Sequence, residues 1–187
     1  MEEMDTRQEM EHPQEPETVK SKGLATVALE YGLLTGIALI VLTLIIYFTG
    51  LQTARWTSWI GYAILLAGLF IGTKSFRDEH NGGFINYGRA LGFGTLSMFF
   101  AALIASVFVY VFYKFIAPDA MGPLREAAEE QILRTNPNIS DQEYDMAMRF
   151  ISPGIIAFTS IFSYTFIGFV LSLITSAFLK RKDPLEA

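Results

Sequence analysis

The feature of this sequence that most constrains its fold is a set of four long segments without Lys, Arg, Asp or Glu. They comprise residues 31–54, 56–73, 90–113 and 150–179. Each reaches or exceeds the roughly 18 to 20 apolar residues that an α-helix needs to cross the hydrocarbon core of a bilayer. The helices of a soluble domain would show a polar face at 3.6-residue intervals, and these segments do not. The sequence therefore predicts an all-α integral membrane protein built as a four-helix bundle.

Polar residues set the boundaries within the chain. The expected spans cover about residues 27–49, 56–73, 88–113 and 153–179, inside a membrane domain of residues 23–182. Residues 1–22 are rich in Glu, Gln and Pro and bury too little apolar surface to order themselves. We expect them to form a disordered acidic N-terminal tail in the cytoplasm, and residues 183–187 to form a second, short tail.

The longest connection, residues 117–149, is expected to be a partly helical outer loop. Ser140 and Glu143 have the spacing of a capping box, which predicts the start of a helix that leads toward the fourth span. Pro153 follows, and a proline at this point is expected to kink or restart the helix.

The distribution of Lys and Arg predicts the orientation in the membrane. Basic residues are more closely spaced on the side shared by both termini and by the polar segment 71–91 than on the side of residues 117–149. Cytoplasmic connections carry an excess of Lys and Arg. Both termini are therefore expected in the cytoplasm.

The polar segment 71–91 is expected to be a tight loop between the second and third spans. Glu30 is placed in the first turn of the first span, where the helix dipole favours a carboxylate. Opposite charges at one membrane boundary can pair and fix the ends of a bundle, and this interpretation is preferred because no charge lies at mid-membrane depth. The alternative is a site for anionic headgroups or the mouth of a pathway. The residues expected at this level are Glu30, Lys74, Arg77, Asp78, Arg89 and Lys180.

All four spans carry small residues at four-residue spacing. In lipid, such residues let helix backbones approach closely, so we assign them to packing and not to ligand binding. They are Gly32, Gly36, Gly68, Gly72, Gly88, Gly92, Gly168, Ser172 and Ser176.

Several function classes find no support in the sequence. There is no cysteine, and His12 and His80 lack a second ligand at metal-binding spacing. No glycine loop for a nucleotide and no known catalytic motif is present. We therefore expect no catalytic, cofactor-binding or metal-binding residue, and no nucleic-acid partner.

One pattern runs from the first span to the start of the third: Tyr31-Gly32-x-x-x-Gly36, Phe76-Arg77-Asp78, Gly82-Gly83, Ile85, Tyr87-Gly88 and Ala90. This pattern resembles a known family, domain of unknown function 4199. This family consists of small four-span membrane proteins found mainly in Bacteroidetes, and the resemblance extends over about residues 25–182. It implies a bacterial inner-membrane protein, and it implies no activity.

Two functions from different classes remain open. The leading hypothesis is a non-enzymatic accessory or scaffold component that acts in the lipid bilayer through helix–helix and loop contacts, with a membrane-protein partner or as a homo-oligomer. The alternative is a small-solute permease or channel subunit formed by oligomerisation.

Overall fold

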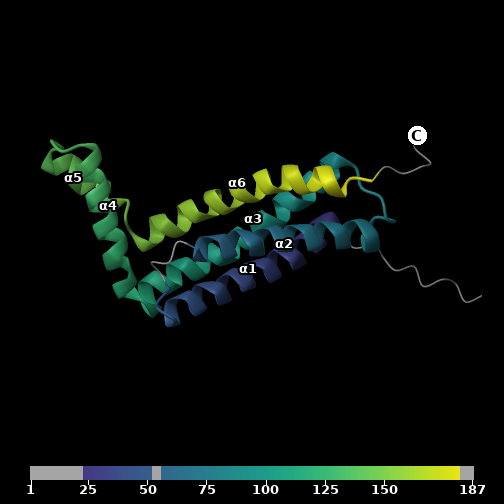
Figure 1. Cartoon of the computed structure of the whole chain (residues 1–187), viewed down its shortest axis with the longest axis horizontal. Helices are drawn as coiled ribbons and strands as arrows, with labels where there is room; N and C mark the ends of the chain where they lie inside the picture. The colour runs from purple at the N-terminus through teal and green to yellow at the C-terminus, as the bar shows by residue number, and fades with distance from the viewer. Residues whose placement is uncertain (1–22, 52–55, 182–187) are drawn as a thin grey trace, which may run out of the picture.

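The computed structural model of the chain describes residues 23–51 and 56–181 (Figure 1). Four segments among these residues are long and apolar enough to cross a membrane: Leu24–Phe48, Thr57–His80, Tyr87–Ile116 and Pro153–Leu179. The chain is an all-α integral membrane four-helix bundle, as its charge-free segments predict. The tails predicted at residues 1–22 and 183–187 lie outside the described residues. The elements are α1 (Leu24–Phe48), α2 (Thr57–Ser75), η2 (Phe76–His80), α3 (Tyr87–Val111), η3 (Phe112–Ile116), η4 (Pro118–Ala120), α4 (Met121–Thr135), α5 (Asp141–Arg149) and α6 (Pro153–Leu179).

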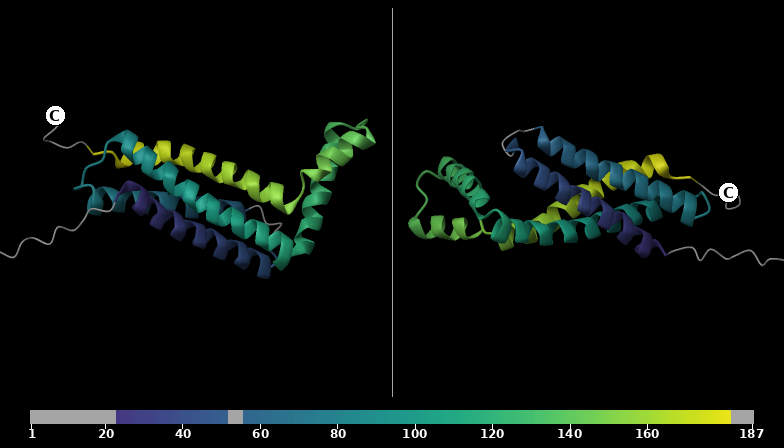
Figure 2. Two further views of the ribbon diagram at one scale, coloured as in Figure 1. Left: turned by 180° about the vertical axis from the view of Figure 1, so that it is seen from behind. Right: turned by 90° about the horizontal axis from the view of Figure 1, so that it is seen from below.

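Helix α3 occupies the middle of the bundle. Its most extensive contacts are with α6 and with α1, and α2 touches all three of these helices. Figures 1 and 2 show the four long helices side by side, while α4 and α5 stand away from one end of the bundle. We refer to this as the hairpin end. The opposite end, which holds the start of α1, residues 76–86 and the last turn of α6, is the loop end.

Two groups of buried side chains fill the bundle. The group at the loop end contains Phe76 and Phe93, whose rings stack with centroids 4.8 Å apart, together with Val27 and Ile85. The second group, nearer the middle, consists of Leu39, Leu65, Leu69 and Met98. Stacked rings and aliphatic side chains from α1, α2 and α3 therefore close the interior between the two ends.

The second span extends further than the sequence indicates. Its predicted end was residue 73, whereas α2 continues to Ser75 and then into η2, a single wider π-type turn that ends at His80. No glycine or proline occurs until Gly82 and Gly83, which adopt positive φ angles of 66° and 85° and turn the chain. The connection between the spans is therefore shorter than residues 71–91, and Lys74, Arg77 and Asp78 lie on a helix end.

The first span also begins earlier than predicted. Helix α1 starts at Leu24, with Gly23 in the N-cap position, and its first turn contains no acidic residue. Glu30 consequently lies in the second turn, so its predicted place in the first turn was wrong. The reason is that Leu24, Ala25 and Thr26 are all compatible with a helix and extend it toward the polar segment.

The connection between α3 and α6 folds into a helical hairpin. The predicted capping box is confirmed: Ser140 caps α5 by accepting from the backbone of Glu143, and the Glu143 carboxylate accepts from the backbone of Ser140. Pro153 is the first residue of α6, where its missing N–H costs no helical hydrogen bond. The chain therefore restarts at Pro153 as a new helix.

Candidate functional site

Glycines of α1 form the closest contact between α1 and α3. A Cβ added at Gly32 would lie 2.5 Å from the carbonyl oxygen of Ser97 and 2.7 Å from the Cβ of Phe100. At Gly36 it would lie 3.2 Å from the carbonyl oxygen of Ala101. The two helices approach this closely only because these positions carry no side chain.

Other predicted small residues also lie against a neighbouring helix. A Cβ added at Gly72 would meet the ring of Tyr31 at 3.0 Å, and one at Gly68 would meet the side chain of Thr35. Gly168 on α6 faces Met98 of α3 in the same way. The hydroxyl of Ser172 donates to the carbonyl oxygen of Leu91 at 3.2 Å, and Ser176 is fully buried on the same face of α6.

Two predicted packing glycines have no such neighbour. Gly88 and Gly92 are exposed, and within the described residues nothing lies within 4 Å of a Cβ added at either position. The contact face of α3 instead contains Gly94, where an added Cβ would meet the side chains of Ser172 and Leu69. Sequence spacing alone misses Gly94, because Gly88 and Gly92 have the same four-residue pattern on the other face.

The glycines already serve contacts inside one chain. Substitution of Gly32, Gly68 or Gly168 by a larger residue would therefore disturb the fold of the chain itself. Loss of a binding partner in such a variant would not show that the glycine contacts the partner. Contacts with a second protein must be sought on other surfaces.

At the loop end, the segment after η2 is joined to the end of α6. The amide nitrogen of Ile85 donates to the carbonyl oxygen of Arg181 at 3.0 Å, and that of Arg181 donates to Ile85 at 2.8 Å. This antiparallel bridge joins the connection between η2 and α3 to the residues that follow α6. The side-chain amide of Asn81 donates to the carbonyl oxygen of Phe84 and holds the turn that leads to it.

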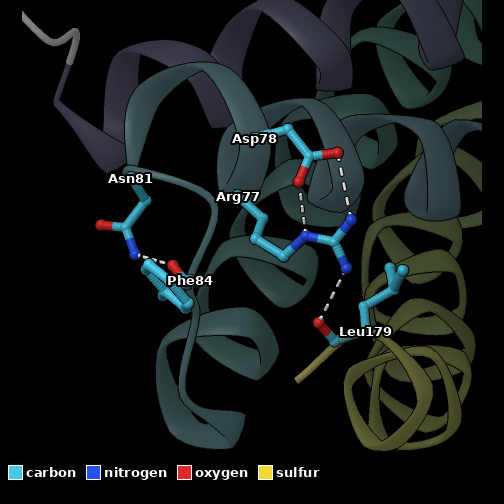
Figure 3. A network of polar contacts seen from close by, with 5 residues as sticks. All are labelled: Arg77, Asp78, Asn81, Phe84 and Leu179. Atoms are coloured by element: carbon cyan, nitrogen blue, oxygen red, sulfur yellow. Dashed lines mark hydrogen bonds and ion pairs between the residues drawn. The ribbon is translucent and has the colours of Figure 1, made fainter. Parts of the chain in front are cut away.

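Arg77 strengthens the same junction. Its guanidinium donates to both carboxylate oxygens of Asp78, at 2.6 and 3.0 Å, and to the carbonyl oxygen of Leu179 at 3.2 Å (Figure 3). The Leu179 carbonyl is at the C-terminal end of α6, where helix carbonyls have no intrahelical partner. One side chain therefore connects η2 to α6, with its planar fork shared between a carboxylate and a helix end.

The remaining predicted charges are distributed around this junction. Lys74 and Arg181 are close enough to Asp78 to attract its carboxylate. Arg89 lies over the ring of Phe76 at 5.7 Å, and Arg181 over the ring of Phe84 at 5.8 Å.

Lys180 is exposed beside the junction, and Glu30 is exposed on α1. Of the six predicted charges, the structure brings Lys74, Arg77 and Asp78 together, and it adds Arg181. Arg181 joins them through the backbone bridge with Ile85, which no local sequence pattern indicates.

This junction has the character of a structural connection. The guanidinium of Arg77 already donates hydrogen bonds to the Asp78 carboxylate and to the Leu179 carbonyl oxygen. Few of its N–H groups therefore remain to bind a ligand. In residues 23–51 and 56–181, no three His, Cys, Asp or Glu side chains are grouped so that they could hold a metal ion.

The hairpin end contains a cavity of about 430 Å³ between α1, α2, η3 and α6. Its apolar lining includes Leu39 and Leu65, which also belong to the buried group around Met98, and Ile167, which packs against that group. The polar lining consists of hydroxyl groups, from Thr43, Thr57, Ser58, Tyr62, Tyr113 and Tyr164. No local sequence pattern indicates this cavity, because its lining comes from four separate elements.

The hairpin itself packs loosely. Met121 is the only buried residue of α4, and α5 has none. The hydroxyl of Tyr144 donates to Glu129 and connects the two helices, which raises the pKa of Tyr144. Arg125 of α4 donates to the carbonyl oxygen of Ile151 at 3.3 Å. Met146 and Phe150, four residues apart, remain 56% and 60% exposed.

The fold and these sites define a class of protein: a small integral membrane four-helix bundle. It has a helical hairpin at one end, and at the other end a loop that is hydrogen-bonded to the end of α6. A family model described as "Protein of unknown function (DUF4199)" matches residues 30–181, and the chain belongs to this family. The resemblance found in the sequence is thereby confirmed. No curated protein and no solved structure matches the chain.

Proposed function

We propose that the protein is a non-enzymatic accessory or scaffold component, in which the membrane bundle anchors the α4–α5 hairpin for contact with a second protein. The observation that carries this proposal is the hairpin itself, which stands away from the bundle and exposes Met146 and Phe150 on adjacent turns. Apolar side chains gathered on a polar surface are typical of interaction sites.

Charge on the hairpin supports a specific contact. Its short helices carry more carboxylates than basic groups, including Glu126, Glu129 and Glu130 on α4 and Asp141 and Asp145 on α5. A partner that covers Met146 and Phe150 would meet this acidic rim, which favours a basic surface on the partner.

The test is purification of the tagged chain from its native membrane after mild cross-linking, with identification of bound proteins and the mass of the particle. The Met146→Lys variant places a charge in the apolar surface and should lose a near-stoichiometric partner at least tenfold. The control, Gln131→Lys, adds the same charge to an exposed position of α4 and should retain the partner. A monomer without a partner, or equal loss in both variants, would reject the proposal.

The second candidate, a small-solute permease or channel subunit formed by oligomerisation, is favoured by the hydroxyl-lined cavity. Leu39 and Leu65 close the inner end of that cavity, so the cavity does not cross the membrane. A pathway across the membrane would have to form between several copies of the chain. This candidate predicts saturable solute flux into liposomes that hold the purified oligomer, and neutralising Glu30 or Arg89 should reduce flux without dissociating it. A scaffold should give no flux above that of protein-free liposomes.

We place the bundle in a bacterial inner membrane, with the loop end and both termini in the cytoplasm. The family resemblance supports the membrane, and the closely spaced basic residues near the loop end support the orientation. Because the chain has no cysteine, single replacements report the side directly. In intact cells an impermeant thiol reagent should label Ser140→Cys and not Asn81→Cys, and the reverse pattern would overturn the orientation.

A further inference from the structure

The cavity at the hairpin end has the shape of a blind vestibule. It extends from Thr57 and Ser58, at the start of α2, to Tyr164 and Ile167, near the middle of α6. Its inner wall is formed by side chains that pack on Met98. Beyond this wall the helices are in close contact, since an added Cβ at Gly94 would meet the side chains of Leu69 and Ser172.

Three phenol hydroxyls of this vestibule are placed to bind something other than the protein. Tyr62, Tyr113 and Tyr164 line this one cavity and come from α2, η3 and α6. None of these three hydroxyls forms a hydrogen bond with another described residue. The hydroxyl of Thr43 donates a hydrogen bond to the carbonyl oxygen of Leu39 at 2.9 Å, so the hydroxyl oxygen remains available as an acceptor.

The same lining disfavours ions. Among the described residues that form it there is no Asp, Glu, Lys, Arg or His. A charge that entered would lose hydration without gaining a countercharge, which is costly in a low-dielectric site. For a neutral molecule with a polar group the desolvation cost is much smaller, because phenols can replace the hydrogen bonds that the group loses with water.

We propose that this vestibule is a binding site for a small neutral molecule that carries a hydrogen-bonding group, such as an amide, hydroxyl or carbonyl, on an apolar or aromatic body. Its volume of about 430 Å³ lies within the range of ordinary ligand pockets. Tyr113 and Tyr164 supply hydrogen bonds to the polar group, while Leu39, Leu65 and the tyrosine rings contact the body. This site is independent of the scaffold role, because it lies inside the bundle and not on the hairpin.

The experiment uses the full chain in phosphatidylcholine nanodiscs, with one cysteine introduced as Thr43→Cys in the vestibule. Alkylation by neutral iodoacetamide is followed in the presence of three probes of nearly equal shape: benzamide, benzoate and benzamidinium. Benzamide should slow the reaction saturably, and the two ions should not. A second chain with Ser140→Cys, on the hairpin, should react at the same rate with and without each probe.

The tyrosine hydroxyls are tested by changing Tyr113→Phe and Tyr164→Phe in the Thr43→Cys chain. These changes keep the rings, and they remove hydroxyls that hold no protein partner, so thermal stability should stay unchanged. Each lost hydrogen bond should raise the benzamide concentration for half-protection about three- to tenfold.

Three results would overturn the proposal. One is the absence of saturable protection by benzamide, and another is equal protection by the two ions. The third is an unreactive cysteine at position 43, which would show that small neutral molecules do not reach the vestibule. Protection by benzamide that persists unchanged in the double phenylalanine variant would reject the role of the hydroxyls.

Discussion

The contact of Gly32 with α3 allows a quantitative prediction for the Gly32→Ala variant. The new Cβ would lie 2.5 Å from the Ser97 carbonyl oxygen, whereas ordinary contacts begin at 3.4 Å, so the helices must separate by about 0.9 Å. A gap of this size removes about a quarter to a half of each dispersion contact along the interface. Insertion of a methyl group into a tight interior typically costs about 1–3 kcal/mol.

The same substitution at Gly92 provides the matched control. Gly92 lies inside helix α3, as Gly32 lies inside helix α1, and within the described residues a Cβ added at Gly92 meets no neighbouring atom within 4 Å. Both substitutions gain the same helix propensity, up to about 1 kcal/mol, so it cancels in the comparison. Gly32→Ala should therefore unfold with a free energy lower than that of Gly92→Ala by about 1–3 kcal/mol.

The assay is reversible unfolding by sodium dodecyl sulfate in mixed micelles, followed by far-UV circular dichroism. Gly36→Ala, whose added Cβ would lie 3.2 Å from the Ala101 carbonyl oxygen, should fall between the two variants. Equal stability of Gly32→Ala and Gly92→Ala, or a more severe loss at Gly92, would refute the packing argument.

Three further outcomes follow from the loop junction and the hairpin. In the Arg77→Lys variant, a lysine lacks the planar fork that contacts both the Asp78 carboxylate and the Leu179 carbonyl oxygen. Hydrogen exchange of the backbone amides of Ile85 and Arg181 should therefore accelerate about fivefold. Unchanged exchange would contradict the role of Arg77 in joining η2 to α6. Ser140→Ala should lower the helicity of α5 in exchange measurements, while Ser140→Asp, which keeps a capping oxygen, should preserve it. Hydrogen bonds from Ser140 hold the pKa of Glu143 below its ordinary value. Protection of α5 should therefore be complete above the ordinary glutamate pKa of about 4.3 and decrease as the pH falls through the lowered folded value, and a loss on raising the pH would contradict it.

The fold was predictable because its main determinant, the absence of charged residues over long segments, can be read directly from the sequence. Four uncharged segments each require a bilayer or a core, and none has the polar face that a soluble helix would show. The start of α5 was predictable for a related reason, since a capping box needs only two residues three positions apart. Local patterns of this kind carry their own geometry.

The errors in the boundaries have an equally local origin. The sequence marks where charges begin, but a helix ends where its backbone must turn. Lys74 and Arg77 are polar yet compatible with a helix, so α2 and η2 continue to His80, and the chain turns at Gly82 and Gly83. At the other boundary, Glu30 was taken to mark a helix start, although Leu24 already begins it.

The sites were only partly predictable because they depend on which faces meet. Gly88 and Gly92 have the same spacing as Gly32 and Gly36, and only the rotation of α3 in the bundle separates exposed glycines from packed ones. The bridge between Ile85 and Arg181 joins segments about a hundred residues apart and uses only backbone atoms, so no side-chain pattern could reveal it. The hydroxyl-lined cavity likewise requires four separate elements to come together.

The central position of α3 has a consequence for the way in which the membrane domain is made. Helices α1 and α2 enter the bilayer before α3 has been synthesised, yet the flat face at Gly32 and Gly36 fits α3 and not α2. Until α3 is present, the first two spans are joined by the contacts of Gly68 and Gly72 of α2 with α1, which are less extensive than the contact of α1 with α3. The most extensive contacts of the bundle become available only once α3 is inserted, so we expect a nascent chain arrested before residue 87 to be degraded by membrane proteases faster than the full chain.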